Sequence, residues 1–246
     1  MKIAVFSDIH SNLEALCAVM EDIHSQGCTR VYCCGDVVGY GGSPNECCNI
    51  LQEFKIATVK GNHDAAIGAD RPLTPGHFNP IATISVQWTR EYTTVSNREW
   101  LDKLPLVLVE QELGITICHA APLNPGDWTY VTSPFKAAPM LGYMPTPVCF
   151  IGHSHEGAVF WMEEDGHVMM VPPCQMRLRP NERYLVNVGS VGQPRDNDAR
   201  ASYFIYDVTD GVITPRRVPY QVTTAQQKIR LAGLPEKLAD RLRIGR

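Results

Sequence analysis

The sequence lacks a long hydrophobic run. None of its 246 residues belongs to a stretch approaching the roughly twenty apolar residues of a transmembrane helix. The apolar start of the chain ends at Asp8, after fewer residues than the roughly seven to fifteen that the core of a signal peptide needs. We therefore expect no membrane partner, no cleaved secretion signal and a cytoplasmic location.

The chain also lacks an excess of basic residues. It has 22 Lys and Arg against 26 Asp and Glu, which gives a formal net charge of −4. Generic nucleic-acid binding usually needs a basic face, because the phosphate backbone supplies most of its affinity. Nucleic acid is therefore not an expected partner.

The spacing of the cysteines argues against a disulfide framework. The nine cysteines are odd in number, and no two of them have the CxxC spacing of redox and zinc motifs. Cys33, Cys34, Cys118 and Cys149 lie inside short apolar runs. We interpret them as small buried side chains of a protein kept in a reducing compartment.

Strand-like and helix-like patterns alternate in the first sixty residues. Short apolar strands are expected at residues 3–6, 30–34 and 55–59. Ser11 is a candidate N-cap for a first helix, and a second helix should begin near Ser43-Pro44. This alternation predicts an α/β fold with parallel strands and helices packed on the sheet.

The pattern of expected elements differs in the rest of the chain. Helices are expected over residues 78–92 and 98–104 and are followed by a series of short strands, which suggests a second, mostly antiparallel sheet facing the first. The strands are expected at residues 106–110, 115–119, 148–152, 159–162, 168–171, 184–188, 202–208 and 212–219.

Two further segments complete the expected single domain, which spans residues 1–246. Residues 121–147 are rich in Pro and Gly, so we expect an irregular loop or small cap beside a site. Its aromatic residues could stack on a nucleobase or anchor the loop to the core. The tail, residues 223–246, carries six basic and two acidic residues and a rough stripe of leucines, which favours a packed helix with a charged outer face.

Several polar fragments each follow a predicted strand. Ligands of open parallel sheets collect beyond the carboxyl ends of the strands, so these side chains should converge. Adjacent glycines allow the sharp turns that this requires. The fragments are Asp8-Ile9-His10, Gly35-Asp36, Gly61-Asn62-His63-Asp64, His119 and Gly152-His153-Ser154-His155, which together hold five of the chain's eight histidines.

In this order the fragments resemble the calcineurin-like metallophosphoesterase superfamily. Residues 187–195 look like the Asn-Pro-Gly-Ser-type segment of its small bacterial and archaeal branch, with Val188 in place of the usual proline. The resemblance implies a four-layer α-β-β-α sandwich of two facing mixed sheets. It also implies a binuclear metal centre and hydrolysis of a phosphoester by a metal-bridged hydroxide.

The resemblance further implies which residues hold each ion. The first ion would be held by Asp8, His10, Asp36 and His155. The second would be held by Asp36, Asn62, His119 and His153, with Asp36 bridging the pair. Such ligands suit Mn, Fe, Zn, Co or Ni, and the sequence does not choose among them. The positive charge of two divalent ions exceeds the negative charge of the two carboxylates, so the centre attracts an anionic phosphate group.

The resemblance places His63 off the metal ions, where it would act on the leaving group as an acid or as a stabilising cation. Asp64 either orients His63 or is a carboxylate at a helix N-terminus without a catalytic role. Asn12, Ser190 and Arg195 are candidates for contacting phosphate oxygens or holding the pocket. Arg195 could equally be a structural ion-pair partner.

Three functions remain open at this point. The first is a phosphoesterase acting on a small phosphomonoester, a phosphodiester, a nucleotide or a dinucleoside polyphosphate. The second is a non-catalytic scaffold that keeps this fold for protein binding. It would be expected to lose ligands, and none is lost here. The third is a nuclease, against which the acidic charge counts. The sequence leaves the oligomeric state open.

Overall fold

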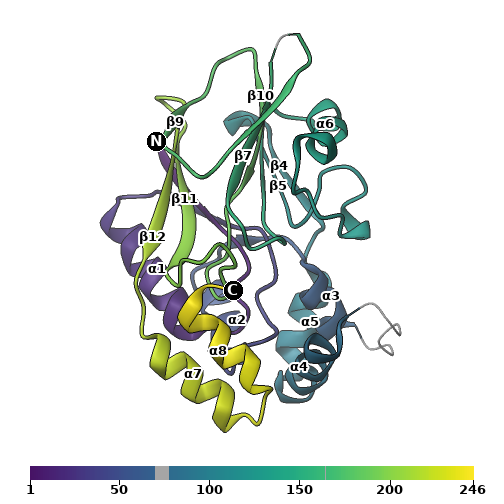
Figure 1. The fold of residues 1–246 in the computed structure, drawn as a ribbon, viewed down its shortest axis with the longest axis vertical. Coiled ribbons are helices and arrows are strands. Elements are labelled where there is room, and N and C mark those ends of the chain that lie inside the picture. Colours follow the sequence, from purple (N-terminus) through teal and green to yellow (C-terminus); the bar gives the residue numbers. More distant parts are fainter. Residues whose placement is uncertain (70–77, 164) are drawn as a thin grey trace.

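Two six-stranded sheets face each other in the computed structural model, which describes residues 1–69, 78–163 and 165–246 (Figure 1). Sheet A has the strand order β3-β2-β1-β11-β12-β9. Its strands are β1 (Lys2–Phe6), β2 (Arg30–Cys33), β3 (Ala57–Thr58), β9 (Met176–Arg177), β11 (Ala201–Asp207) and β12 (Val212–Val218). The strands β3, β2 and β1 run parallel, and the others are added antiparallel.

Sheet B has the strand order β4-β5-β6-β10-β7-β8. Its strands are β4 (Val107–Glu110), β5 (Ile115–Cys118), β6 (Val148–Ile151), β7 (Ala158–Met162), β8 (Val168–Val171) and β10 (Arg183–Asn187). The central strands β5, β6 and β10 are parallel, and antiparallel strands flank them. Both sheets are therefore mixed.

Helices cover the outer faces of the two sheets. The α-helices are α1 (Leu13–Ser25), α2 (Pro44–Glu53), α3 (Asn62–Gly68), α4 (Pro80–Tyr92), α5 (Val95–Lys103), α6 (Pro134–Tyr143), α7 (Val222–Leu231) and α8 (Glu236–Ile244). Two short 3-10 helices are η1 (Gln111–Leu113) and η2 (Pro125–Asp127). In Figure 1, α1 lies beside sheet A and α6 lies on the far side of sheet B.

The alternation of side chains along β1 explains the layers. Ile3 and Val5 point between the two sheets, while Ala4 and Phe6 pack under the helices of sheet A. Sheet B repeats this pattern, with Phe150 of β6 facing inward and its neighbours packing toward α6. Because successive residues of a strand face opposite sides, two apolar faces per sheet produce the predicted four-layer sandwich. That prediction is confirmed.

One prediction about the sheets was wrong. The segments 202–208 and 212–219 were expected in the second sheet, but β11 and β12 join sheet A. β11 pairs antiparallel with β1, with Ile3 opposite Tyr206. An alternating pattern defines a strand but not its partner, and an antiparallel strand on a parallel sheet is common.

The expectation of an irregular segment over 121–147 was also wrong in part, because α6 lies within it. Ser133 caps α6 by accepting a hydrogen bond from the backbone N–H of Lys136. Pro134 occupies the first turn, where no donor is needed, and Pro139 is tolerated inside the helix. Ala137 and Leu141 are buried against sheet B, so packing offsets the hydrogen bond that Pro139 removes.

The ends of the other helices and strands differ from the predicted ends by small amounts. The N-cap of α1 is Asn12 rather than Ser11, and the short elements α3 and β9 had no clear sequence signal. The cysteines Cys33, Cys34, Cys118 and Cys149 are buried as expected. None of the described helices combines the length and the apolar character needed to cross a membrane.

The C-terminal tail contains α7 and α8, which lie together at the lower end of the molecule (Figure 1). Leu234, Leu238 and Leu242 are buried in one cluster with Tyr40 and Ala82, while Leu231 is 88% exposed. The tail therefore packs on the same body that carries β1 and β2.

Replacing Leu238 with Ala should lower the free energy of unfolding by about 2–5 kcal/mol, because a fully buried leucine leaves a cavity. The matched control is Leu231→Ala, at an exposed position, which should change the free energy of unfolding by less than about 0.5 kcal/mol. Urea denaturation measures both. Equal, small effects would show that the tail does not contribute to the core.

Candidate metal centre

The candidate ligands lie where parallel strands end. Asp8 follows β1, and Asp36 and Asn62 follow β2 and β3 of the same sheet. His119 and His153 follow the parallel strands β5 and β6 of sheet B. The facing sheets bring these two sets of strand ends together.

The first ligand cluster consists of Asp8, His10 and His155, all buried. The Nε2 atoms of His10 and His155 are 3.0 Å apart, and His155 Nε2 is 3.2 Å from Oδ1 of Asp8. With bonds of about 2.1 Å, ligand atoms of one ion lie about 3.0–3.4 Å apart. The cluster therefore has the dimensions of a coordination shell.

The hydrogen bonds behind these rings decide which nitrogen faces the centre. Nδ1 of His10 donates to the carbonyl oxygen of Val38, and Nδ1 of His155 donates to that of Gln193. Both Nε2 atoms therefore carry lone pairs, which repel at 3.0 Å unless a cation lies between them. Oδ1 of Asp8 is also buried without a hydrogen-bond partner. These atoms fit a metal ion.

The second cluster consists of Asp36, His119 and His153, also buried. Nδ1 of His119 donates to the carbonyl oxygen of Cys34, so its Nε2 is turned toward the cluster. That Nε2 lies 3.1 Å from Nδ1 of His153 and 3.2 Å from Oδ1 of Asn62. A second ion could be held here by an acid, an amide oxygen and two imidazoles.

Asp36 lies between the two clusters. Its Oδ2 is 3.6 Å from Nε2 of His10 in the first cluster and 3.4 Å from Nε2 of His119 in the second. Its Oδ1 accepts a hydrogen bond from the backbone N–H of His63, which fixes the carboxylate. One carboxylate oxygen can thus contribute to both clusters.

Much of the ligand backbone has a left-handed conformation. Asp8, His10, Asp36, His153 and His155 all have φ between 48° and 69°. For residues other than Gly such angles are uncommon and cost of order 1–3 kcal/mol each. Their concentration here indicates that the surrounding fold forces the chain into sharp turns that direct these side chains inward.

The protonation states of the imidazoles depend on their burial and on the charges of neighbouring side chains. Burial and the charge of His119 lower the pKa of His153 to about 3, and burial and Arg195 lower the pKa of His155 to about 4. Burial opposes protonation of His119, but Asp36 outweighs it and raises the pKa of His119 to about 10. At neutral pH two of the imidazoles are neutral and ready to bind a cation, and His119 must release a proton.

His63 lies beside the clusters and lines the same pocket. Its ring is 4.9 Å from that of His10 and 4.6 Å from that of Tyr40, and its Nδ1 has no hydrogen-bond partner. Burial lowers the pKa of His63, so a nearby phosphate anion is needed to favour its protonated form. His63 is also close enough to Asp36 and His10 to form a third potential ligand group.

The carboxylate of Asp64 bonds to the backbone of neighbouring loops. It accepts hydrogen bonds from the backbone N–H groups of Gly61, Asp36, Val37 and Val38. The geometry therefore favours the helix-terminus interpretation over an orienting role. Asp64 ties the loop after β2 to the start of α3 and so positions Asp36.

Asn12 and Ser190 also bond to the backbone. Asn12 caps α1 and donates to the carbonyl oxygen of Gly192, and Ser190 donates to that of Asp8. Both side chains are buried, and neither lines the pocket over the metal ligands. Of the two roles considered for them, these contacts match holding the pocket in place.

A pocket of about 210 Å³ opens over the clusters. Besides the ligands and His63, its walls include Tyr40, Phe78, Trp128, Tyr130 and Arg195. The ring of Tyr130 stacks on that of His153 at 3.9 Å. Of the four aromatic side chains considered in 121–147, only Trp128 and Tyr130 line this pocket. Phe135 and Tyr143 on α6 are exposed.

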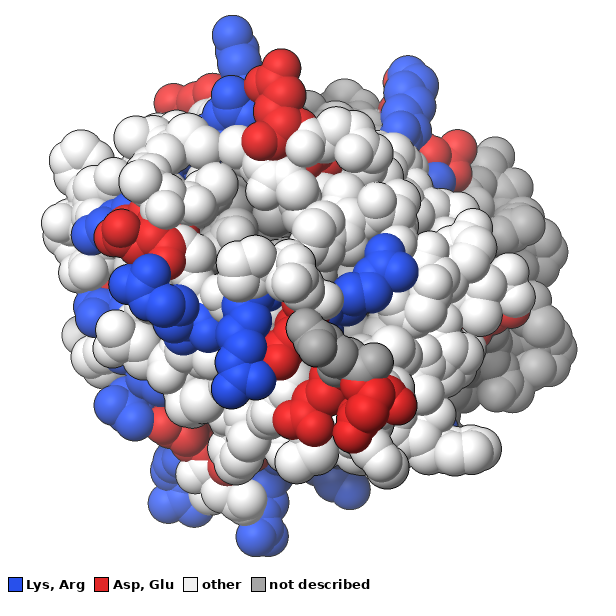
Figure 2. Space-filling view, turned by 90° about the horizontal axis from the view of Figure 1, so that it is seen from above, with Lys and Arg blue, Asp and Glu red and all other residues white. Residues whose placement is uncertain are grey.

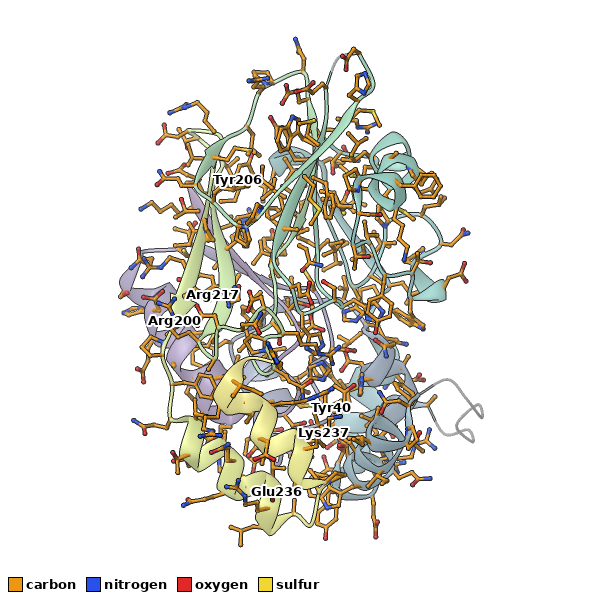
Figure 3. All side chains as sticks on the ribbon, in the orientation of Figure 1. Tyr40, Arg200, Tyr206, Arg217, Glu236 and Lys237 are labelled. Carbon is orange, nitrogen blue, oxygen red and sulfur yellow. The ribbon has the colours of Figure 1, made fainter. Side chains whose placement is uncertain are left out.

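Tyr40 had not been expected in the pocket, whereas Phe78 lies at the start of the segment 78–92, the alternative to 121–147 as a pocket wall. Tyr40 lies between α8 and α4 in Figure 3 and is 4.6 Å from the ring of His10. The run Gly39-Tyr40-Gly41-Gly42, just after Asp36, is the signal that could have identified Tyr40, since flanking glycines let a backbone approach closely. Phe78 shows no comparable signal.

The fold and the paired clusters together define a metal-dependent hydrolase of the two-sheet sandwich type. A family model described as calcineurin-like phosphoesterase superfamily domain matches residues 1–211, and the chain belongs to that superfamily. Membership supports a hydrolase that acts on phosphoester bonds and uses divalent metal ions.

The chain is similar to three proteins along nearly its whole length. The chain is 39% identical over 246 residues to the uncharacterized protein MJ0912 of Methanocaldococcus jannaschii, covering 99% of this chain and 98% of that one. The crystal structure of a metallophosphoesterase from Sphaerobacter thermophilus has a TM-score of 0.86 and 34% identity, with 100% and 99% of the two chains covered. The hypothetical protein PH1004 from Pyrococcus horikoshii OT3 shares the fold, with a TM-score of 0.81, 19% identity and 100% and 98% coverage.

A methyl group at Gly152 should disturb metal binding. A Cβ atom there would overlap Oγ of Ser7 and Oδ2 of Asp8, so Gly152→Ala should lower both the bound metal per chain and the melting temperature. Gly142→Ala is the control, because a Cβ there meets nothing within 4 Å. Metal analysis and thermal unfolding test this. Unchanged metal content in Gly152→Ala would contradict the assigned geometry of Asp8.

Proposed function

We propose that the chain is a binuclear metallophosphoesterase that hydrolyses a small phosphomonoester or phosphodiester, such as a nucleotide. The observation that carries this proposal is the position of Asp36, whose single Oδ2 lies within 3.6 Å of a ligand nitrogen from each cluster. A carboxylate shared in this way is suited to two ions about 3.5–4 Å apart. When bound, two such ions supply positive charge and an activated water for attack on phosphorus.

The residues of the chain supply the remaining parts of the reaction. His63 lies on the pocket wall beside the two clusters and can donate a proton or a hydrogen bond to the departing oxygen. Asp64 fixes the backbone next to Asp36, and Asp36 in turn accepts the N–H of His63. His63, the proposed acid, and Asp36, the proposed bridging ligand, are thus held in place by residues at the start of α3.

Two other functions are less well supported. A non-catalytic scaffold has no need of a complete set of buried ligands whose lone pairs face each other. A nuclease would be expected to carry a basic surface, yet on the face shown in Figure 2 acidic and basic side chains are intermixed among uncharged ones. A small pocket lined by aromatic side chains favours a small substrate.

Protein purified without chelator should contain about two transition-metal ions per chain, and His153→Ala should reduce this to about one. Asp36→Ala should lose most of both, because it contributes to both clusters. Metal analysis by mass spectrometry gives the stoichiometry. Full activity in protein stripped of metal would falsify the mechanism.

Replacing His63 with Ala should leave the metal content unchanged and lower kcat by about 10²–10⁴-fold, the usual contribution of an acid or base. The loss should shrink with nitrophenyl esters, whose leaving group needs little protonation. His167→Ala, at an exposed histidine, is the control and should match the wild type. If His63→Ala loses metal instead, His63 is a ligand rather than an acid.

A further inference from the structure

Four imidazoles belong to the two ligand clusters, and three of them share one kind of supporting contact. Nδ1 of His10, of His119 and of His155 each donates to a backbone carbonyl oxygen. A hydrogen bond of this kind fixes the tilt of the ring and leaves the other nitrogen facing the cluster. The fourth imidazole, that of His153, is held in a different way.

His153 lacks the supporting hydrogen bond. Its Nδ1 faces the second cluster, 3.1 Å from Nε2 of His119, so an ion bound there leaves the proton of the neutral ring on Nε2. That Nε2 is buried and has no hydrogen-bond partner among the residues that the structure describes. The backbone of His153 is fixed, because its N–H donates to Oδ2 of Asp8 at 2.9 Å, but no hydrogen bond from Nε2 fixes the tilt of the ring.

The ring of Tyr130 covers the imidazole of His153. The two ring centres are 3.9 Å apart and the planes differ by 26°, so the rings are stacked. A stacked imidazole cannot tilt without losing this contact or colliding with the neighbouring ring. Val131, the next residue in the chain, is buried in the hydrophobic cluster under α6, which anchors the backbone beside Tyr130. The stack can therefore replace the missing hydrogen bond.

Trp128 offers a comparison within the same loop. Its ring meets that of His119 edge-on, with the centres 5.8 Å apart and the planes at 70°. His119 already donates Nδ1–H to the carbonyl oxygen of Cys34. Both Trp128 and Tyr130 line the pocket of about 210 Å³. Of the two, Tyr130 is the one that covers the face of a ligand without a supporting hydrogen bond.

We propose that Tyr130 is a positioning residue for the second metal ion, because its ring holds the imidazole of His153 with Nδ1 toward His119 and Asp36. The inference rests on the proposed function for the presence of that ion. It goes beyond the proposed function by giving the loop 121–147 a part in metal binding. The first ion, at Asp8, His10 and His155, should not depend on Tyr130.

The test is a titration of metal-free protein with Co²⁺, whose visible absorption reports the ligands of each bound ion. Tyr130→Ala should weaken binding of the second Co²⁺ by about 10- to 100-fold, the usual loss when a contact that orients a metal ligand is removed. The first Co²⁺ should bind as in the wild type. Tyr130→Phe keeps the flat ring, so both affinities should stay within about threefold of the wild type, as calorimetry on the same samples measures.

Trp128→Ala is the matched control for metal binding. It removes an aromatic side chain from the same loop and pocket, beside a ligand that has its own hydrogen bond. It should change the affinity for the second Co²⁺ by less than about threefold.

Thermal unfolding of the metal-free variants tests for a structural role. Tyr130 is 46% exposed, so metal-free Tyr130→Ala should melt close to the wild type. A lower melting temperature together with weaker binding of both ions would show that Tyr130 supports the fold rather than one ligand, and the proposal would be wrong.

Kinetics with 4-nitrophenyl phosphate separate positioning from a direct contact with the substrate. Saturating Co²⁺ should restore kcat of Tyr130→Ala toward the wild-type value, with little change in KM, because the lost affinity is then offset by metal concentration. A raised KM at saturating Co²⁺, with unchanged affinity for the second ion, would make Tyr130 a substrate contact and would overturn the positioning role.

The same measurements separate this inference from the proposed function. If the wild type binds two ions and Tyr130→Ala binds them equally well, the positioning role is wrong and the proposed function stands. If Tyr130→Ala loses the second ion selectively but the wild type hydrolyses no phosphoester, the positioning role stands and the proposed function fails.

Discussion

The architecture of the site depends on hydrogen bonds that point away from it. His10, His155 and His119 each donate Nδ1–H to a backbone carbonyl oxygen, which fixes both the tautomer and the tilt of the ring. The carbonyls belong to loops that follow strands of sheet A or to the segment after β10. The ring nitrogens consequently face inward before any ion arrives, so the cost of orienting them is met during folding.

This arrangement requires an unusual backbone conformation in a few loops. They must turn within two or three residues of a strand end, and several of their residues adopt left-handed angles that only the surrounding packing can maintain. Asp64 and Ser190 bond to the backbone of these loops, Asp64 at Asp36 and Ser190 at Asp8. Polar side chains that resemble substrate contacts in the sequence are thus used to hold ligands in position.

The sequence predicted those features that depend on local pattern. Strand periodicity was enough to predict an α/β fold with a second sheet facing the first, and the polar fragments at strand ends singled out the residues that form the paired clusters. The four layers and the division of the ligands between two ions came from the resemblance to the superfamily. Strand partnership was not predictable in the same way, because the residue pattern of β11 does not specify that it pairs with β1 and β12. The helix α6 was missed because Pro139 counts against a helix locally, whereas its stability comes from burying Ala137 and Leu141 against sheet B.

Side chains that meet only through tertiary contact were the least predictable. Asp64 follows His63 directly in sequence, yet its carboxylate bonds to the loop after β2 rather than to the imidazole. The end of α8 docks on the segment 192–198, where the backbone N–H of Asn197 donates to the carbonyl oxygen of Gly245. No local pattern in either segment predicts this contact.

The place of β1 in sheet A has a consequence for biosynthesis. β1 precedes both of its partners in the sequence: it lies between β2 and β11, and β11 spans Ala201–Asp207. One edge of β1 therefore stays unpaired until β11 has been synthesised. Asp8, at the end of this strand, reaches its final position only when Ser190 and His153 have also emerged, so the first ligand in sequence is among the last to be fixed.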